Sequence, residues 1–213
     1  MSNSLNAQIA LIFRIVHGRN IPWILDHGVH CGRSSVRDPN YVTIGNAELI
    51  AKRTNRNIPV PPQGTLEDYV PFYFTPYSPM LFNIKTGYNG ITRRPNQEIV
   101  ILVSSLHRLT ELQVPFIFSD RHALLETARF STDTADLDRI DWKILQERDF
   151  KRDLNDLQKM ERYQAEALVY NRFPIEALLG VTCYNAAAGA QLETEMTKRK
   201  LNLRVLVKPT WYF

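Results

Sequence analysis

The segments that constrain the fold most are two short runs rich in β-branched and aromatic residues, at positions 98–103 and 114–119. Runs of this length and composition are typical of buried strands. Further strands are expected at residues 7–16, 69–75, 166–170 and 203–207, and helices at residues 20–28, 46–56, 141–150, 154–163 and 187–200. Because strands and helices do not alternate regularly, we predict an α+β fold with a mainly antiparallel sheet.

Length and composition indicate a single globular domain over residues 1–213, long enough to bury a core without disulfides. The net charge of +4 permits a polyanionic partner without requiring one. Cys31 and Cys183 form neither a metal-ligand spacing nor a disulfide framework. The sequence has no secretory signal and no apolar run of about 20 residues. We therefore expect a cytoplasmic protein without membrane association.

One acidic residue, Glu166, stands at the start of the apolar segment 167–170. In a strand, residues two apart point to the same face, so Gln164 and Glu166 are expected side by side at an accessible cleft. This pair resembles the Gln-x-Glu arrangement of ADP-ribosyltransferases. A fixed carboxylate can stabilise the oxocarbenium-like state in which nicotinamide leaves ribose, and the amide could orient the acceptor. The alternative interpretation is a solvated pair at a strand edge.

Three groups of charged residues add to this pattern. Arg14 interrupts an apolar strand, so it is expected to face a cleft or bind an anion, unless a buried ion pair neutralises it. Residues 52–56 hold three cations beside a proline-rich stretch and indicate either a phosphate-binding segment or a solvated helix face. The polar residues 120–122 directly follow a predicted strand, where side chains often line a site.

Other chemistries find little support in the sequence. His27, His30 and Cys31 are possible metal ligands, but no second cluster completes a tetrahedral site, so no metal is expected. The serines and cysteines lack the surroundings of an activated nucleophile. Neither a Gly-x-Gly-x-x-Gly nor a Walker pattern occurs, which argues against a Rossmann or P-loop nucleotide site.

Taken together, the motifs resemble one family, the DarT DNA ADP-ribosyltransferase toxins of bacterial toxin–antitoxin systems. The resemblance covers nearly the whole chain and is carried by residues 14–17, 20–21, 53, 68–74, 78–81, 114–118, 120–122, 163–166 and 211–212. It implies an ADP-ribosyltransferase fold with a split, mainly antiparallel sheet and flanking helices. It also implies NAD as donor, a base in single-stranded DNA as acceptor, and a cognate antitoxin with ADP-ribosyl hydrolase activity, of the macrodomain type or related to it.

Matching positions in the motifs suggest roles for individual residues. The resemblance makes Glu166 the catalytic carboxylate and places Arg53 at the acceptor base. It places Gln164 and His122 at the border of the active site. The residues implied in NAD binding are Arg14, His17, Asn20, Tyr73 and Met80.

The acceptor base follows from one departure within the first motif. Thymidine-modifying members begin this motif with histidine, whereas this chain has Arg14, which resembles the guanine-modifying branch. We therefore expect guanine, with thymidine as the alternative and RNA or protein as further possible acceptors.

A rival hypothesis is a non-catalytic nucleic-acid binder. In that case Tyr69, Phe72, Tyr73 and Phe74 would stack on bases while the cations of residues 52–56 hold phosphates.

Overall fold

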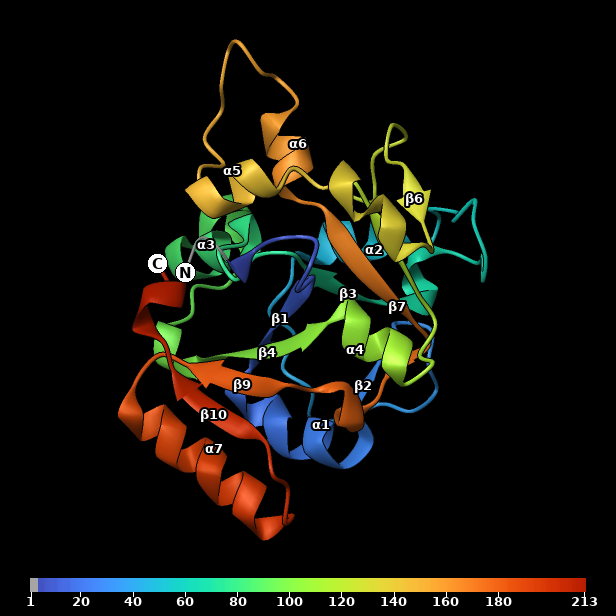
Figure 1. Cartoon of the computed structure of the whole chain (residues 1–213). Coiled ribbons are helices and arrows are strands. Elements are labelled where there is room, and N and C mark those ends of the chain that lie inside the picture. Colours follow the sequence, from blue (N-terminus) through green and yellow to red (C-terminus); the bar gives the residue numbers. More distant parts are fainter. Residues whose placement is uncertain (1–3) are drawn as a thin grey trace.

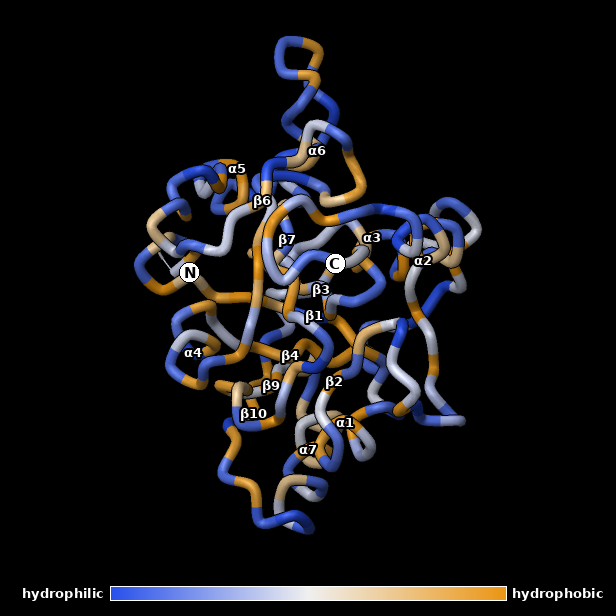
Figure 2. Tube along the Cα trace, turned by 90° about the vertical axis from the view of Figure 1, so that its right-hand side faces the viewer, coloured by the Kyte–Doolittle hydropathy of each residue, from blue (hydrophilic) through white to orange (hydrophobic). Residues whose placement is uncertain are grey.

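The computed structural model describes residues 4–213 and confirms the α+β prediction (Figure 1). Helices α1 and α7 lie at one end of the molecule, and α5 and α6 lie toward the other (Figures 1 and 2). The strands are β1 (Leu11–His17), β2 (Val29–His30), β3 (Tyr69–Tyr73), β4 (Ile99–Ser105), β5 (Phe116–Ser119), β6 (Phe130–Ser131), β7 (Glu166–Tyr170), β8 (Arg172–Phe173), β9 (Gly180–Cys183) and β10 (Arg204–Val207).

Helices surround the sheet and are mostly short. The α-helices are α1 (Ile21–His27), α2 (Ala47–Arg53), α3 (Pro79–Thr86), α4 (Leu106–Glu111), α5 (Trp142–Glu147), α6 (Lys159–Tyr163) and α7 (Ala186–Lys198). Single 3-10 turns are η2 (Gly18–Asn20), η3 (Leu66–Asp68), η4 (Tyr88–Gly90), η5 (Asn96–Glu98), η7 (Ile175–Ala177) and η8 (Pro209–Trp211), and η6 (Thr134–Arg139) is longer. No helix in residues 4–213 is long and apolar enough to cross a membrane.

Within the described residues, one sheet has the strand order β10-β9-β4-β1-β3-β7-β5-β6. Every neighbouring pair is antiparallel except β9 and β10, which run parallel. Strands β2 and β8 form a separate two-stranded ribbon. The predicted antiparallel character is therefore confirmed, and the parallel pair at one edge is an addition to it.

The sequence patterns located most elements but not all of them. The first strand begins at Leu11 rather than at residue 7, because Asn6 closes a turn by accepting hydrogen bonds from Ile9 N and Ala10 N, both at 2.9 Å. Helix α3 and strand β9 were not predicted. Strong capping signals mark α3 nevertheless, because Ser78 accepts from Leu81 N, Pro79 occupies the first turn and Gly87 ends the helix with a φ of 78°.

The core is built on the pairing of β1 with β4. These strands pair over seven residues, from Leu11 opposite Ser105 to His17 opposite Ile99. Most apolar side chains of both strands are buried, and the central strands follow hydrophobic segments of the chain (Figure 2). This half of the sheet is a continuous ladder, and it fixes the position of Arg14 at its edge.

The sheet splits between β1 and β3, which share only the pair Phe13 with Tyr73. Pro71 lies in the middle of β3 and has no N–H to donate, while its carbonyl accepts from the side chain of Arg14 at 2.7 Å. Prolines within sheets are usually confined to edge strands, strand starts or bulges. Pro71 instead lies in an interior strand, on the side where the ladder is broken.

Candidate active site

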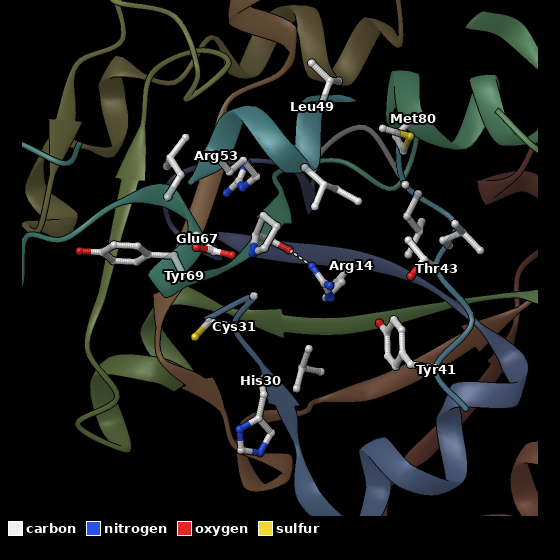
Figure 3. A pocket seen from close by; sticks show the side chains of 18 of the residues that line it. Arg14, His30, Cys31, Tyr41, Thr43, Leu49, Arg53, Glu67, Tyr69 and Met80 are labelled. Carbon is white, nitrogen blue, oxygen red and sulfur yellow. Dashed lines mark hydrogen bonds between the residues drawn. The ribbon is translucent and has the colours of Figure 1, made fainter. Parts of the chain in front are cut away.

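A cavity of about 610 Å³ opens beside this split. This volume is within the range of about 300–1,000 Å³ that is typical of pockets for drug-sized ligands. The walls come from β1, β3, α1, α2, the loop 31–46 and the segment 122–124. In the view of Figure 3, Arg14 lies between Arg53 on α2 and Tyr41 on the loop. The cavity is therefore assembled from segments that are far apart in sequence.

Glu166 is the first residue of β7 and lines this cavity. Its Oε2 accepts from Arg53 Nη1 at 2.9 Å, and its Oε1 accepts from Ala123 N at 3.1 Å. The expectation that Glu166 is freely accessible is wrong, because only 4% of the residue is exposed. The carboxylate is held in one orientation by neighbouring groups, as electrostatic stabilisation of a transition state requires.

The surroundings of Glu166 keep its carboxyl group ionised. Burial alone would raise its pKa, but the charges of Arg53 and His122 and the hydrogen bond from Ala123 N outweigh burial, so the pKa lies below the ordinary value of 4.5. His122 Nδ1 lies 3.7 Å from Oε1 and accepts from Leu124 N at 3.2 Å. At 3.7 Å, His122 Nδ1 is too far from Oε1 for a hydrogen bond, so the ring is a close neighbour of the carboxylate without bonding to it.

Gln164 does not stand beside Glu166 on a strand. It ends α6, with φ −99° and ψ 26°, and its Nε2 donates to Met160 O at 3.1 Å. The helix therefore ends at Tyr163, directly before this residue, and the strand begins only at Glu166. Consequently the side chain of Gln164 is not part of the cavity wall.

The basic run at residues 52–56 divides into three different environments. Lys52 is exposed and pairs with Glu48 at 2.7 Å, as expected for a solvated helix face. Arg53 turns inward to Glu166, and its Nη2 is buried without a hydrogen-bond partner. Arg56 donates to two backbone carbonyls of the segment 122–125. Only Arg53 lines the cavity.

Arg14 faces the cavity, as predicted. Its Nη1 donates to Pro71 O, and its Nε is buried and has no hydrogen-bond partner (Figure 3). Within residues 4–213, Arg14 forms no ion pair. The alternative expectation, a buried ion pair that neutralises Arg14, is therefore wrong for the described residues. Arg14 Nε and Arg53 Nη2 are thus two buried donors without a hydrogen-bond partner, and both belong to residues that line the cavity. Guanidinium groups are well suited to bind phosphate and carboxylate oxygens.

Two other residues implied in NAD binding, Tyr73 and Met80, also line the cavity. Tyr73 is the cross-strand neighbour of Glu166. Burial, followed by the negative charge of Glu166, raises the pKa of its hydroxyl, so this group remains a hydrogen-bond donor at neutral pH. Met80 extends from the first turn of α3.

His17 and Asn20 lie behind the cavity rather than on its wall. His17 is 4% exposed, accepts from Arg19 N through Nδ1 and places Nε2 3.2 Å from Glu98 Oε2. Asn20 is fully buried, and its amide donates to Val42 O at 2.9 Å and accepts from Val42 N at 2.8 Å. Asn20 therefore holds the loop 31–46, which forms one side of the cavity.

Several lining residues were not foreseen from sequence. Tyr41 lines the cavity from the loop 31–46, whose sequence has no hydrophobic periodicity. The end of this loop does carry a signal, because Asn46 caps α2 by accepting a hydrogen bond from Leu49 N. Trp23 and His30 form an aromatic wall, with ring centroids 5.6 Å apart. Burial, with the nearby charge of Arg172, lowers the pKa of His30, so this ring is neutral at pH 7.

The possible metal ligands are engaged in other contacts. His27 Nδ1 lies 3.0 Å from Trp23 O, and His30 Nε2 lies 3.2 Å from His27 O. In residues 4–213, no group of three or more histidine, cysteine or acidic side chains is arranged to hold a metal ion.

The rings invoked for a non-catalytic nucleic-acid binder are mostly core residues. Tyr69, Phe72 and Phe74 are each exposed by 1% or less. Buried rings cannot stack on bases, so the aromatic segment gives no support to that hypothesis.

Comparison with known proteins agrees with this geometry. A family model described as ssDNA thymidine ADP-ribosyltransferase, DarT, matches residues 13–213. The chain is also 54% identical over 212 residues to the DNA ADP-ribosyl transferase of Escherichia coli O127:H6 (strain E2348/69 / EPEC), covering 100% of this chain and 97% of that protein. The chain belongs to the DarT family.

Solved structures of the DarT family share the fold. Thermus sp. 2.9 DarT in complex with ADP-ribosylated ssDNA superimposes with a TM-score of 0.89 at 30% identity, covering 97% of each chain. The same protein in complex with NAD+ gives a TM-score of 0.83. Thermosipho africanus DarTG in complex with ADP-ribose is 17% identical, with a TM-score of 0.76 over 96% of this chain and 51% of that one, and indicates the fold alone.

DarT membership confirms the predicted ADP-ribosyltransferase fold and the enzyme class, an NAD-dependent DNA ADP-ribosyltransferase. It does not confirm the guanine-modifying branch, because the description of the matching family names thymidine.

Proposed function

We propose that residues 1–213 form one catalytic domain that transfers ADP-ribose from NAD to a base in single-stranded DNA and releases nicotinamide. The observation that carries this proposal is Glu166, a buried, ionised carboxylate oriented by Arg53 and Ala123 N at the wall of the cavity. A cytoplasmic setting suits a protein that acts on DNA and NAD.

The donor side is assigned to residues that face the cavity. Glu166 stabilises positive charge on the ribose as its bond to nicotinamide breaks. Arg14 donates from its free Nε to a phosphate or ribose oxygen of NAD, and Tyr73 and Met80 pack against the donor. His17 and Asn20 act from behind the wall, by fixing β1 and the loop 31–46.

The acceptor side is assigned to Arg53, with His122 at its border. A base atom attacks the anomeric carbon, a new bond to that carbon replaces the bond to nicotinamide, and the base loses a proton. Arginine is too basic to take that proton, so Arg53 stabilises the base electrostatically while Glu166 accepts the proton. Gln164 Nε2 donates to Met160 O and the residue does not line the cavity, so its side chain has to reorient to contact the acceptor. Single-stranded DNA avoids the cost of unstacking a base from a duplex.

Thymidine is the proposed acceptor base, since the matching family is described as thymidine-modifying. Guanine is the second candidate, favoured by Arg14 at the head of the first motif. Arg14 Nη1 donates to Pro71 O, so one nitrogen of the guanidinium is engaged within the sheet, which leaves fewer donors to read a base.

The test uses four single-stranded oligonucleotides, each with one kind of target base, incubated with labelled NAD and analysed by mass spectrometry. An adduct on thymidine alone supports the proposal, and an adduct on guanine alone supports the second candidate. Duplex DNA and RNA of the same sequence test the acceptor class.

A variant with Glu166→Gln keeps the shape of the site and should lose about two to three orders of magnitude in rate. Glu126→Gln changes an exposed glutamate and should leave the rate unchanged. Full transfer by a folded Glu166→Gln protein would contradict the proposed role of the carboxylate.

We also propose a cognate antitoxin that removes ADP-ribose from the modified DNA, of the macrodomain type or related to it. The support is the DarT resemblance. Co-expression with a candidate hydrolase should abolish the DNA adduct without changing nicotinamide release by this chain.

A further inference from the structure

A second, smaller apolar core lies apart from the main one and supports the segment next to Glu166. Its buried members are Ile58, Leu66, Tyr69, Ile117, Ala123, Ala128, Phe130 and Leu168. They join the proline-rich stretch after α2 to the segment 120–129 between β5 and β6. Ala123, whose N–H donates to Glu166, is fully buried within this core.

Arg56 connects the two halves of the small core. Its Nε donates to Ala123 O at 3.3 Å, and its Nη2 donates to Leu125 O at 2.8 Å. The guanidinium also lies over the ring of Phe130, 5.9 Å from the centroid. The Arg56 carbonyl accepts from Leu66 N at 2.9 Å, so the backbone of this residue is fixed as well.

We infer that Arg56 is a positioning residue for Glu166. By holding the carbonyl of Ala123, it fixes the orientation of the adjoining peptide, whose N–H donates to the carboxylate. Arg56 does not line the cavity, so its effect on the reaction passes through Ala123. This inference rests on the proposed catalytic role of Glu166.

The contacts require the shape of arginine as well as its charge. The two carbonyls that Arg56 binds are two residues apart, and a planar guanidinium can donate to both at once from a fixed fork. The ammonium of lysine is a point donor on a flexible stem, so it cannot reproduce this pair of contacts. Lysine would, however, serve almost equally well if the residue only attracted a DNA phosphate.

A substitution of Arg56 that frees the carbonyl of Ala123 should also misplace the Ala123 N–H, and this should change the pKa of Glu166. The groups that face this carboxylate are Arg53 from α2, His122 and the Ala123 N–H from the segment after β5, and Tyr73 from β3. Without a well-placed N–H, the buried carboxylate loses one group that favours its ionised form. The acid limb of the rate profile should therefore move to higher pH.

The experiment compares Arg56→Lys with Arg204→Lys, which makes the same change on the exposed edge strand β10. Arg56→Lys should lower kcat for DNA modification about 10- to 100-fold, as expected for a misplaced catalytic group. Its KM for NAD and for DNA should change little, and its acid limb should shift upward. Arg204→Lys should behave as the parent protein. Arg56→Lys keeps the charge and the aliphatic stem, so we expect it to fold, and its thermal midpoint is measured alongside.

The outcomes are separable when Glu166→Gln is measured in parallel. If Glu166→Gln is inactive and Arg56→Lys has the parent kcat and pH profile, the inference about Arg56 fails while the proposed function stands. An increase in the KM for DNA alone also overturns it, because that result indicates a phosphate contact. If Glu166→Gln remains active, both the proposed catalytic role of Glu166 and this inference are wrong.

Discussion

Lys52 and Arg53 are adjacent residues with the same charge, yet their side chains occupy opposite environments. Lys52 is 60% exposed and pairs with Glu48 on the same helix, whereas Arg53 is 14% exposed and pairs with Glu166 across 113 residues of sequence. An exposed pair of this kind contributes little to stability. Removing one partner of a buried pair typically costs about 3–5 kcal/mol, because the remaining charge stays uncompensated.

The first prediction compares these two neighbours. Arg53→Ala should reduce DNA modification by at least about two orders of magnitude while changing NAD affinity much less, because Arg53 is the residue proposed to stabilise the acceptor base and it orients Glu166. Lys52→Ala removes the same charge from an exposed position and should have nearly normal activity. Isothermal titration with NAD and initial rates on a DNA oligonucleotide provide the two readouts. A collapse of NAD affinity with unchanged turnover would move Arg53 to the donor site.

The second prediction concerns pH. The pKa of Glu166 in the folded protein lies below 4.5, so the ionised form that catalysis needs persists above that value and is lost only as pH falls further. The contribution of Glu166 to stability is present over the same range and disappears in the same direction. In Arg53→Ala, burial still raises the pKa but the largest opposing charge is gone, so the acid limb should lie at higher pH.

Rates of the parent protein and residual rates of Arg53→Ala, measured between about pH 3 and 7, test this prediction, because that range includes the ordinary glutamate pKa of about 4.3. Circular dichroism is the folding control. Identical acid limbs for the parent protein and Arg53→Ala would contradict it.

At the scale of elements, the loop 31–46 depends on one side chain for its middle section. Residues 38–45 make few backbone hydrogen bonds to the rest of the molecule, and Asn20 bonds both the N–H and the carbonyl of Val42. The same section supplies Tyr41 and Thr43 to the cavity wall. Asn20 therefore couples the turn after β1 to the shape of the donor pocket.

The third prediction follows from this clamp. Asn20→Ala should raise the KM for NAD about tenfold with a smaller effect on kcat, since a buried pair of amide hydrogen bonds contributes on the order of 1–3 kcal/mol. Asn20→Asp retains one acceptor but places a carboxylate against Val42 O, so it should not restore the affinity. Asn202→Ala, at an exposed position, is the matched control. A change in kcat alone would contradict this role.

At the scale of the whole molecule, the strands with clear apolar runs were predictable, because burial on both faces leaves a composition signal in β4 and β5. Strand β9 was missed because it contains only Gly180–Cys183 and follows a turn. The order of strands in the sheet could not be predicted from local sequence patterns, because neighbours such as β1 and β4 are far apart in the sequence. Local periodicity carries no information about such pairing.

The site was predictable where a residue's chemistry conflicted with its surroundings. Arg14 in an apolar strand and Glu166 before one both line the cavity. His17 and Asn20 belong to the same motif, but their orientation behind the wall depends on tertiary contacts with Glu98 and Val42. The role of Ala123 could not be predicted, because its N–H is a backbone group and every residue except proline has one.

The split between β1 and β3 has a consequence for hydrogen–deuterium exchange. Backbone amides on the side of β1 that faces β3 lack a continuous ladder, so their protons should exchange faster than those of β4, which is paired with strands on both sides. A dinucleotide that bridges Arg14 and Tyr73 would shield both edges from solvent. NAD should therefore slow exchange in peptides covering residues 11–17 and 69–73 and leave 99–105 unchanged. Equal protection across all three peptides would indicate general tightening of the sheet instead of a ligand that joins its two halves.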